Sequence, residues 1–277
     1  MRLIYNAKTL IMGILNVTPD SFYDGGIYFD TEKAIERAYQ LHREGADIID
    51  IGGESTRPGA KPISIQEEID RVCPVIEAVA HNIDIPISID TYRSKVAEEA
   101  VKLGASIVND ISGLSFDEEM ADIVSKYNSY LIVMHIRGTP ENMQNNPTYD
   151  NLLFEIYSYL EGAINRAIEH GIARDRIIID PGIGFGKTLE DNYTIIRNLG
   201  FFKGMGLPLL VGISRKSLIG RLYHQDENRL PATIALNALS IFWGADIIRV
   251  HDVKEHRLAL ASLEMLKKVN YINGSCI

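Results

Sequence analysis

The chain has 277 residues, of which 46% are hydrophobic and 23% are charged, a composition that excludes collagen, coiled-coil proteins and intrinsically disordered chains. Its 28 Lys and Arg residues stand against 37 Asp and Glu residues, which gives a net charge of −9. This acidic balance argues against a nucleic-acid partner, because non-specific binding to nucleic acid needs a basic surface.

Short apolar runs recur along the chain and predict eight β-strands. The runs are rich in Ile and Val, and most lack polar alternation, as expected of parallel strands that are buried on both faces. In chain order, the predicted strands are Leu10–Val17, Ile48–Ile51, Ile85–Ile89, Ile107–Val108, Tyr130–Met134, Ile177–Ile179, Leu209–Ile213 and Ile247–Val250.

A helical pattern follows each predicted strand. In the first of them, apolar side chains recur at helical spacing from Ala34 to Leu41, and Gly45 marks the end of the helix. The predicted helices are Thr31–Glu44, Ile65–Ala80, Tyr92–Leu103, Asp117–Tyr127, Asn151–His170, Leu189–Asn198, Leu230–Trp243 and His256–Val269.

The order of one strand and then one helix, repeated eight times, predicts an α/β fold, the (β/α)8 TIM barrel. An open, doubly wound sheet is the alternative, but an uninterrupted series of parallel strands favours closure. We expect residues 1–277 to form a single domain, because no linker, low-complexity tract or internal repeat divides them. In such barrels the active site lies at the C-terminal ends of the strands.

Polar or charged residues stand at the C-terminal end of every predicted strand. Some of them, such as Asp110 and Asp252, are explained as helix caps. Asp90 and Asp180 fit that explanation poorly, because each ends an Ile-rich strand, where an unpaired carboxylate would be costly. The strand-end residues considered for a site are Asn16, Asp50, Asp90, Asn109, Asp110, His135, Arg137, Asp180, Ser214, Arg215, Lys216, Ser217, Arg249, His251 and Asp252.

Two predicted loops, Thr18–Gly26 and Gly52–Lys61, are rich in Gly, Pro and polar residues. They are either plain flexible surface or a pair of lids that close over a substrate, and the sequence favours the two readings almost equally.

The segment Gly182–Lys187 looks like a phosphate-binding loop but fits neither common pattern. A P-loop needs Gly where Pro181 stands, and a dinucleotide fingerprint needs Gly where Lys187 stands. We interpret its glycines as shaping the loop and allowing the backbone to approach a ligand closely.

Arg249 and His251 lie two residues apart after a buried strand, so they project to one side and together suit a phosphate. A capping role for His251 is the alternative. The 7 His residues form no zinc-binding pattern, and Cys73 and Cys276 are too few for a disulfide framework or a metal site.

We expect a cytoplasmic protein without a membrane partner. The N-terminal residues Met1–Tyr5 lack the apolar region of a signal peptide. No stretch of the chain approaches the ~20 apolar residues that a membrane-spanning helix needs.

Seven short motifs in series resemble those of the dihydropteroate synthases. The resemblance runs from about Met12 to Asp252, and the motifs fall on the strand ends that hydropathy alone predicts. One departure is Tyr23, where many family members have Ser. The motifs are Met12–Phe22 with Asp24-Gly25-Gly26, Asp50–Gly59, Ser88–Thr91, Asn109–Ser112, Asp180–Gly182, Ser214–Ser217 and Arg249–Asp252.

The resemblance implies a (β/α)8 barrel with transferase activity. Such enzymes join p-aminobenzoate to a dihydropterin that carries a CH₂-diphosphate group, giving dihydropteroate and diphosphate in folate synthesis. It further implies small-molecule partners, Mg²⁺ as cofactor with Asn16 as its ligand, and a homodimer formed through helices late in the chain. Leu260, Leu263 and Leu266 are compatible with that interface or with the core.

The resemblance also assigns roles to single residues. Catalytic roles fall to Asp90, Lys216 and Arg57, with Arg57, Arg249 and His251 as cationic partners of the diphosphate. The pterin-binding residues are Asp90, Asn109, Asp180, Lys216 and Arg249. The diphosphate-binding residues are Asn16, Thr56, Arg57, Arg249 and His251. The p-aminobenzoate-binding residues are Phe22, Pro58, Lys216 and Ser217.

Two other functions stay open. A methyltransferase that binds methyltetrahydrofolate would share the pterin-binding carboxylates, but it would not need the Ser214–Ser217 motif or the loop that contains Phe22. A non-catalytic pterin-binding paralogue would not need Asn16, Arg57 and Lys216 intact. We expect no second folate enzyme fused to the barrel, because the barrel uses the length of the chain.

Overall fold

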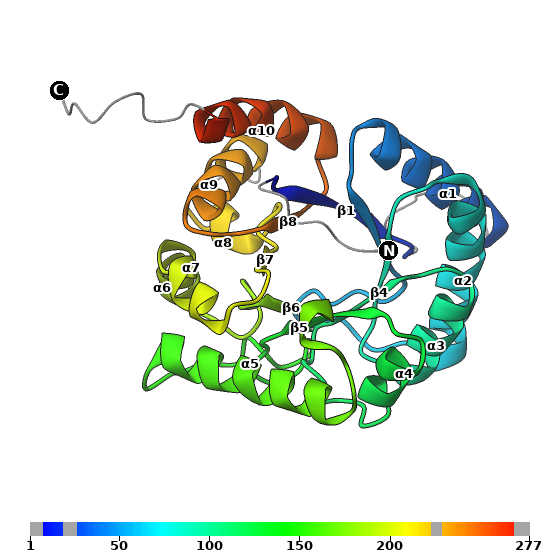
Figure 1. Ribbon diagram of the computed structural model, residues 1–277, viewed down its shortest axis with the longest axis horizontal. Coiled ribbons are helices and arrows are strands. Elements are labelled where there is room, and N and C mark those ends of the chain that lie inside the picture. The colour runs from blue at the N-terminus through cyan, green and yellow to red at the C-terminus, as the bar shows by residue number, and fades with distance from the viewer. Residues whose placement is uncertain (1–7, 19–26, 223–228, 269–277) are drawn as a thin grey trace.

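A computed structural model describes residues 8–18, 27–222 and 229–268 of the chain. Its strands are all parallel and follow the order β6-β5-β4-β3-β2-β1-β8-β7, and a bridge between Ile179 and Leu209 brings the two edge strands together. The sheet therefore closes into a barrel, as predicted, and does not form an open, doubly wound sheet (Figure 1). The strands are β1 (Leu10–Asn16), β2 (Ile48–Gly52), β3 (Ile87–Asp90), β4 (Ile107–Asp110), β5 (Tyr130–Met134), β6 (Ile177–Asp180), β7 (Leu210–Val211) and β8 (Ile247–Val250).

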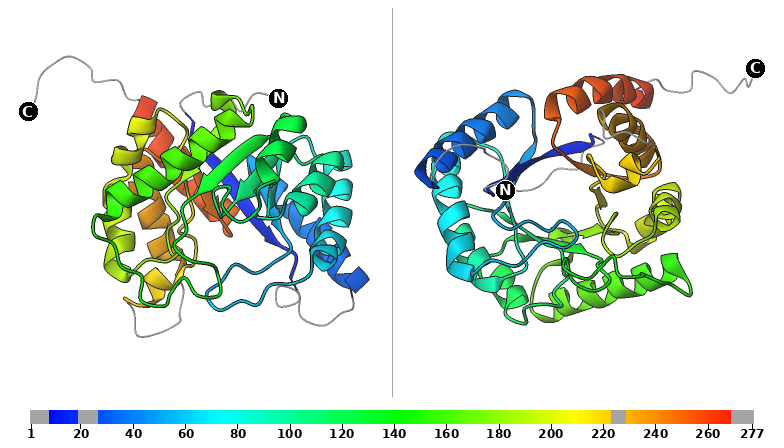
Figure 2. Two further views of the ribbon diagram at one scale, coloured as in Figure 1. Left: turned by 90° about the horizontal axis from the view of Figure 1, so that it is seen from below. Right: turned by 180° about the vertical axis from the view of Figure 1, so that it is seen from behind.

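Helices form the outer layer, and Figure 2 shows them around the strands from below and from behind. All the predicted helices are present, with ends that differ by a few residues. They are α1 (Ile27–Arg43), α2 (Ile65–Asn82), α3 (Ser94–Lys102), α4 (Met120–Lys126), α5 (Leu152–Glu169), α6 (Leu189–Arg197), α9 (Leu230–Phe242) and α10 (Val253–Lys268). Within the described ranges, no helix is long and apolar enough to cross a membrane.

Within the residues that the structure describes, four short helices were not predicted. Each has only 3 or 4 residues, which is too short for an apolar periodicity to be recognised. They are η2 (Arg174–Arg176), α7 (Leu199–Phe202), η3 (Lys203–Met205) and α8 (Ser217–Gly220).

The strands lack polar alternation because apolar layers cover both of their faces. One layer lies between the strands and the helices, where Ile49 and Ile51 of β2 pack in the same cluster as Val72 and Val75 of α2. The other fills the barrel and consists of strand residues alone: Leu10, Met12, Ile48, Ile107, Tyr130, Ile132, Ile178, Leu210 and Ile247.

A polar layer continues this inner face toward the C-terminal mouth of the barrel. Residues two apart in a strand share a face, so the residue two positions after an inner apolar residue also points inward. The pairs that share the inner face in this way are Ile48 and Asp50, Ile107 and Asn109, Ile178 and Asp180, and Ile247 and Arg249. The barrel thus brings predicted site residues from distant parts of the chain to one place.

Candidate active site

The centre of the barrel mouth is an ion-pair network around Arg249 of β8. Its Nε donates to Asp50 Oδ2 at 2.6 Å and its Nη2 donates to Asp90 Oδ2 at 2.5 Å. Asn109 of β4 donates from Nδ2 to the same Asp50 oxygen at 3.2 Å. One guanidinium therefore connects β8 with β2 and β3, and Asp50 connects it onward to β4.

The network leaves buried oxygens without a partner. Asp50 Oδ1, Asp90 Oδ1 and Ser88 Oγ are buried, and the described residues offer none of them a hydrogen bond. A buried acceptor without a donor costs about 1–3 kcal/mol. These oxygens are therefore suited to accept N–H groups or a positive charge from a ligand that enters the mouth.

The protonation of Asp90 is sensitive to this environment. Burial raises the pKa of its carboxyl group to about 7, the guanidinium of Arg249 opposes the rise, and the nearby carboxylate of Asp50 adds to it. Burial also lowers the pKa of Arg249, but Asp50 and Asp90 more than compensate, so that its pKa is raised and it stays cationic. The mouth consequently holds one fixed cation and at least one carboxylate that can lose its charge near neutral pH.

Asp180 ends β6 on the other side of the mouth. Its Oδ1 accepts a hydrogen bond from the backbone N–H of Gly182 at 2.7 Å. Burial raises the pKa of Asp180, whereas that hydrogen bond and the ammonium of Lys216 oppose the rise. A carboxylate oxygen has two lone-pair positions, so Asp180 can still accept hydrogen bonds from a ligand.

Lys216 precedes α8 and lies against the loop that follows β6. Its Nζ donates to the carbonyl oxygen of Ile183 and stands 4.5 Å from the ring centre of Phe185. Burial lowers the pKa of Lys216 to about 8, an effect that the carboxylate of Asp180 opposes and the cation Arg249 strengthens. Lys216 is therefore a half-buried amine whose charge, like that of Asp90, changes close to neutral pH.

His251 follows β8 and differs from its predicted role as a cation. Burial lowers its pKa to about 4, and the cations Arg249 and Arg215 add to this effect. Its Nδ1 lies 2.9 Å from Ser214 Oγ, which also accepts a hydrogen bond from the His251 backbone N–H at 3.1 Å. At neutral pH His251 is therefore an uncharged hydrogen-bonding group in this structure, and its contact with a phosphate stays a prediction.

The loop of residues 53–63, which connects β2 to α2, carries Thr56, Arg57 and Pro58. Arg57 and Pro58 are exposed, and Gly59 reaches across to donate its backbone N–H to the carbonyl oxygen of Pro140 at 3.1 Å. Arg57 is also close enough to contribute to the low pKa of His251. The loop thus lies over the mouth between the ends of β2 and β5.

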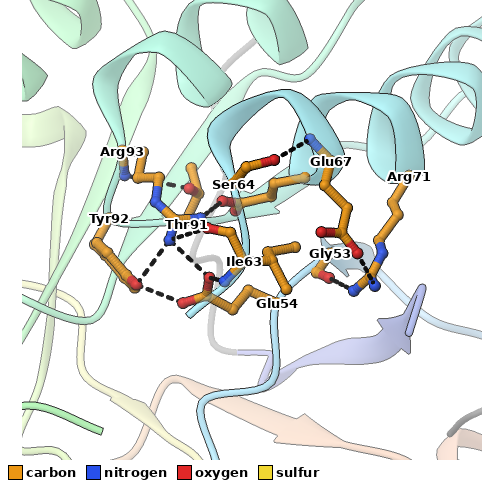
Figure 3. A network of polar contacts seen from close by, with 10 residues as sticks. Gly53, Glu54, Ile63, Ser64, Glu67, Arg71, Thr91, Tyr92 and Arg93 are labelled. Atoms are coloured by element: carbon orange, nitrogen blue, oxygen red, sulfur yellow. Dashed lines mark hydrogen bonds and ion pairs between the residues drawn. The ribbon is translucent and has the colours of Figure 1, made fainter. Parts of the chain in front are cut away.

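Both ends of this loop are attached to Arg93, which lies three residues after Asp90 (Figure 3). Arg93 Nη2 donates to Glu54 Oε2 at 2.7 Å and to the carbonyl oxygen of Ile63 at 2.9 Å. The backbone N–H of Ile63 donates to the same Glu54 oxygen at 2.9 Å, and the Tyr92 hydroxyl donates to the other Glu54 oxygen. We call Glu54, Ile63, Tyr92 and Arg93 the loop root, because they close the base of the loop and tie it to the chain that follows β3.

The Nη1 atom of Arg93 forms an ion pair with a second carboxylate, that of Glu68 in α2. Burial raises the pKa of Glu68, whereas a hydrogen bond from Thr91 and the charge of Arg93 oppose the rise. Arg93 therefore bridges two largely buried carboxylates, and this gives the loop root a fixed geometry.

The remaining predicted residues have simpler outcomes. Ser217 is exposed at the start of α8, and Asn16 is partly exposed at the end of β1, beside Gly52. Asp110 accepts hydrogen bonds from Ser112 and Leu114 and holds a turn, in agreement with a purely local role. Phe22 and Tyr23 lie outside the described residues.

Two groups of buried side chains were missed by the sequence interpretation. Asp50 appeared there only as one strand-end residue, although it interrupts an Ile-rich strand in the same way as Asp90 and Asp180. Lys187 and His135 are both buried, and Lys187 Nζ lies 2.9 Å from His135 Nδ1. A lysine directly after a glycine-rich segment was the available signal for the second group, and it was used only to reject a dinucleotide motif.

The residues present fit Mg²⁺ only as an ion with few protein ligands. The described residues include no cluster of three or more His, Cys, Asp or Glu side chains that could hold a metal. Asn16 offers one carboxamide oxygen at the mouth. A single such ligand is compatible with Mg²⁺, which keeps several waters and is often completed by the phosphates of a substrate.

Comparisons with known proteins agree with this geometry. The family described as "Pterin binding enzyme" matches residues 12–251. A dihydropteroate synthase of Bacillus subtilis is 48% identical over 274 residues, which cover 98% of this chain and 94% of that protein. A crystal structure of dihydropteroate synthase from Clostridium difficile, in the presence of pteroic acid, is similar with a TM-score of 0.89 and 44% identity over 96% of this chain and 99% of that chain. A structure of the Xanthomonas albilineans dihydropteroate synthase with 4-aminobenzoic acid gives a TM-score of 0.91 and 38% identity over 97% of this chain and 96% of that chain.

Proposed function

The chain belongs to the dihydropteroate synthases, a family of pterin-binding enzymes, and from this premise we propose how its barrel mouth performs their reaction. The enzyme joins p-aminobenzoate to (7,8-dihydropterin-6-yl)methyl diphosphate. The bond between the CH₂ carbon and the diphosphate oxygen breaks, a bond from the aniline nitrogen to that carbon forms, and one proton leaves the nitrogen. The products are 7,8-dihydropteroate and diphosphate.

The observation that carries the mechanism is the polar layer at the mouth, where Arg249 holds Asp50 and Asp90 and each carboxylate keeps one buried oxygen without a partner. Departure of diphosphate leaves positive charge spread over the pterin. A carboxylate already fixed in a buried site stabilises such a charge without reorganisation. We assign this role to Asp90, with Arg249 keeping the two carboxylates in place.

Pterin recognition falls to side chains around the polar layer. The amino-pyrimidine edge of a pterin presents adjacent N–H donors, which a carboxylate matches, and Asp180 is the carboxylate placed to accept them. Asn109 has both a donor and an acceptor and suits a mixed edge. Lys216 reaches ring acceptors, and Arg249 lies flat against the ring while its charge faces the diphosphate.

The diphosphate would lie where the loop of residues 53–63 meets the ends of β1 and β8. Thr56 and Arg57 come from that loop, and Arg249 and His251 come from β8 and the residues after it. Arg57 and Arg249 supply charge, while His251 supplies a hydrogen bond. Mg²⁺, when bound through the amide oxygen of Asn16, supplies further charge to the leaving group.

We propose that the site for p-aminobenzoate lies above the pterin, between the predicted loops Thr18–Gly26 and Gly52–Lys61. Phe22 and Pro58 would enclose its ring, and Ser217 with Lys216 would receive its carboxylate. An aniline nitrogen is a weak nucleophile, so correct placement next to the cation contributes more than a strong base would. The same two loops would also keep out water, which would otherwise react with the cation.

The test is diphosphate release from the pterin substrate in the presence of Mg²⁺, measured with and without p-aminobenzoate. We expect release to require p-aminobenzoate and to yield dihydropteroate in equal amount. Tight pterin binding without turnover would instead indicate a non-catalytic paralogue, and methyl transfer from methyltetrahydrofolate would indicate the methyltransferase. Omission of Mg²⁺ in the same assay tests the cofactor.

We also propose that the protein is a homodimer, but through a different surface from the predicted stripe. Leu260 is 3% exposed and belongs to the core, and Leu263 packs against that core. Helices α9 and α10 are neighbours in the outer layer (Figure 1). Large apolar side chains on these two helices are exposed instead, and Phe242 is the most exposed at 82%. The set is Leu239, Phe242, Leu258 and Met265. Light scattering after size-exclusion chromatography measures the mass directly.

Two broader predictions accompany this function. We propose that residues 1–277 act as one pterin-binding domain in the cytoplasm, and that small molecules are its partners. Fractionation of cells that contain the protein tests the location.

A further inference from the structure

The segment Gly182–Lys187, which we call the glycine arm, lies directly on the chain that follows β5. Gly182 and Gly186 have φ values of +71° and +66°, which side chains rarely adopt. A Cβ atom on Gly182 would lie 1.9 Å from the carbonyl oxygen of His135, and one on Gly186 would lie 2.5 Å from that of Arg137. The glycines that resemble a phosphate loop in sequence therefore serve close packing of two backbones.

Lys187 fixes the end of this arm from inside the protein. The residue is 1% exposed, and its Nζ donates to the carbonyl oxygen of Phe185 at 2.9 Å. The same Nζ lies 2.9 Å from Nδ1 of His135. Burial lowers the pKa of His135 to about 2, so the imidazole is neutral and can accept this hydrogen bond. The buried amine of Lys187 thus forms one hydrogen bond within the glycine arm, to Phe185, and one to His135 in the segment that follows β5.

The outer side of the arm holds Lys216. The carbonyl oxygen of Ile183 accepts a hydrogen bond from Lys216 Nζ, and the ring of Phe185 lies under the same nitrogen. Phe185 therefore connects the two lysines: its carbonyl oxygen accepts a hydrogen bond from Lys187, and its ring contacts the Nζ atom of Lys216. Three further hydrogen bonds to residues outside the arm keep it in place. Gln144 donates to the carbonyl oxygen of Gly184, Tyr149 donates to that of Gly186, and the backbone N–H of Gly184 donates to Asn192 Oδ1 at 2.6 Å.

We propose that Lys187 is a positioning residue of the reaction: by fixing the glycine arm, it sets the place and the hydration of the Lys216 ammonium. The role of Lys216 toward the pterin rests on the proposed function. The contacts among Lys187, the glycine arm and Lys216 do not depend on that function. This role explains why the glycine-rich motif and the buried Lys187 occur together, which contacts with a ligand alone do not explain.

The charged groups around Lys187 and Lys216 determine how the pKa of Lys216 would respond if the glycine arm loosened. Lys216 faces Asp180 of β6, Asp90 of β3 and Arg249 of β8, and burial is the largest cause of its lowered pKa. Burial also lowers the pKa of Lys187 well below its ordinary value, with Asp180 and Asp191 opposing this and Lys216 and Arg137 adding to it. If the arm loosened, water would reach Lys216 and raise its pKa toward that of an ordinary lysine.

The experiment compares Lys187→Met, which keeps the side-chain volume without a donor, with Lys187→Gln, which keeps an N–H donor one bond short. The pKa of Lys216 is measured from the pH dependence of its labelling by acetic anhydride, read by mass spectrometry. We expect about 8 in the unaltered protein, a rise in Lys187→Met and a smaller rise in Lys187→Gln. In parallel, kcat/KM for the pterin substrate should fall in Lys187→Met, by up to about 100-fold for a displacement near 1 Å.

Asn237→Leu is the matched control. Asn237 is 1% exposed and its Nδ2 lies 2.9 Å from His256 Nε2, between α9 and α10, so the substitution also removes a buried hydrogen bond to a histidine. It should lower thermal stability without moving the pKa of Lys216. If Lys187→Met folds poorly, Lys187→Gln carries the comparison, because it keeps a donor in the buried site and should still raise the same pKa.

An unchanged Lys216 pKa in Lys187→Met and in Lys187→Gln would overturn the proposal and leave Lys187 with a structural role only. Because labelling requires no turnover, this result is distinct from a failure of the proposed reaction, which would appear as an inactive unaltered protein with the expected labelling profile.

Discussion

Two loops at the barrel mouth are held in opposite ways. The loop of residues 53–63 is fixed mainly at its root, by charged and hydrogen-bonding groups around Arg93. At its tip Arg57 and Pro58 are exposed, and one backbone hydrogen bond joins Gly59 to Pro140. The glycine arm is fixed along its length, by backbone packing on residues 135–137 and by the buried Lys187. A loop with a fixed base and a tip held by a single backbone hydrogen bond can adjust to a ligand. A loop packed along its length provides a rigid wall, and the two should therefore affect different ends of the substrate.

Asp180→Asn tests the rigid side and should have the largest effect. The amide places a donor against the N–H groups of the pterin, while its remaining oxygen can still accept from Gly182. We expect plain pterin to bind about 100-fold more weakly, because a buried donor that faces a donor costs about 3 kcal/mol. Isothermal titration calorimetry measures this affinity.

Asp110→Asn provides the control for that measurement. Asp110 also ends a strand, but it is adjacent to Asn109 and so points to the opposite face, away from the mouth. Pterin affinity should be retained in Asp110→Asn. Equal affinities in Asp180→Asn and the unaltered protein would contradict the assignment of Asp180.

Arg57→Ala tests the tip of the adjustable loop. We expect pterin diphosphate to bind about 20-fold more weakly, since a charge-assisted hydrogen bond contributes about 2 kcal/mol, whereas plain pterin should bind as before. Lys61→Ala removes another exposed cation from the same loop and should change neither affinity. Equal losses for the two ligands in Arg57→Ala would show that the loop does not single out the diphosphate.

Arg93→Lys tests the root of that loop. Lysine keeps the charge but cannot bind Glu54, Glu68 and the Ile63 carbonyl at once. We expect KM for pterin diphosphate and for p-aminobenzoate to rise about 5-fold, as for a modestly misplaced loop, with plain pterin affinity unchanged.

Arg176→Lys is the corresponding control at the other end of the barrel. Arg176 donates to the carbonyl oxygen of Asn128 and lies over the ring of Tyr130, at the start of β5. It should leave both KM values as they are. A loss of plain pterin binding in Arg93→Lys would mean that the root supports the whole mouth and not the loop alone.

The pH profile should show the smallest effects, a few-fold in kcat/KM. Asp90 acts as a carboxylate, and its pKa is raised to about 7, so activity should fall as the pH drops below 7. Lys216 acts as an ammonium with a pKa of about 8, so activity should fall again above 8. After correction for ionisation of the diphosphate, kcat/KM reports these groups in the free enzyme. A flat profile between pH 6 and 9 would contradict both assignments.

The sequence predicted the barrel well because its strands are buried on both faces and leave an unmistakable apolar pattern. It also pointed to Asp90 and Asp180, since a carboxylate at the end of an Ile-rich strand needs a compensating partner. The partners themselves were out of reach. Arg249 binds Asp50 across 199 positions of the chain, and only the closed barrel brings the two together.

The loops were harder to predict for the same reason. Arg93 lies 39 positions from Glu54 and 25 from Glu68, and nothing in the local pattern distinguishes it from a surface arginine. The glycine arm was recognised as unusual, but its glycines avoid clashes with His135 and Arg137, and such a contact has no local signal. Nothing in the sequence indicated the surroundings of His251, where burial and the three nearby arginines Arg249, Arg215 and Arg57 lower its pKa.

The position of Arg249 in the chain has a consequence for synthesis of the protein. Asp50 and Asp90 emerge from the ribosome early, and the only guanidinium that the described structure places between them belongs to the last strand. Until β8 is made, any partial barrel holds the carboxyl groups of Asp50 and Asp90 without the guanidinium that pairs with them. Addition of β8 to the nascent chain therefore closes the barrel and pairs Arg249 with Asp50 and Asp90 in the same step. An incomplete barrel is consequently disfavoured at its mouth, where the ligand would bind.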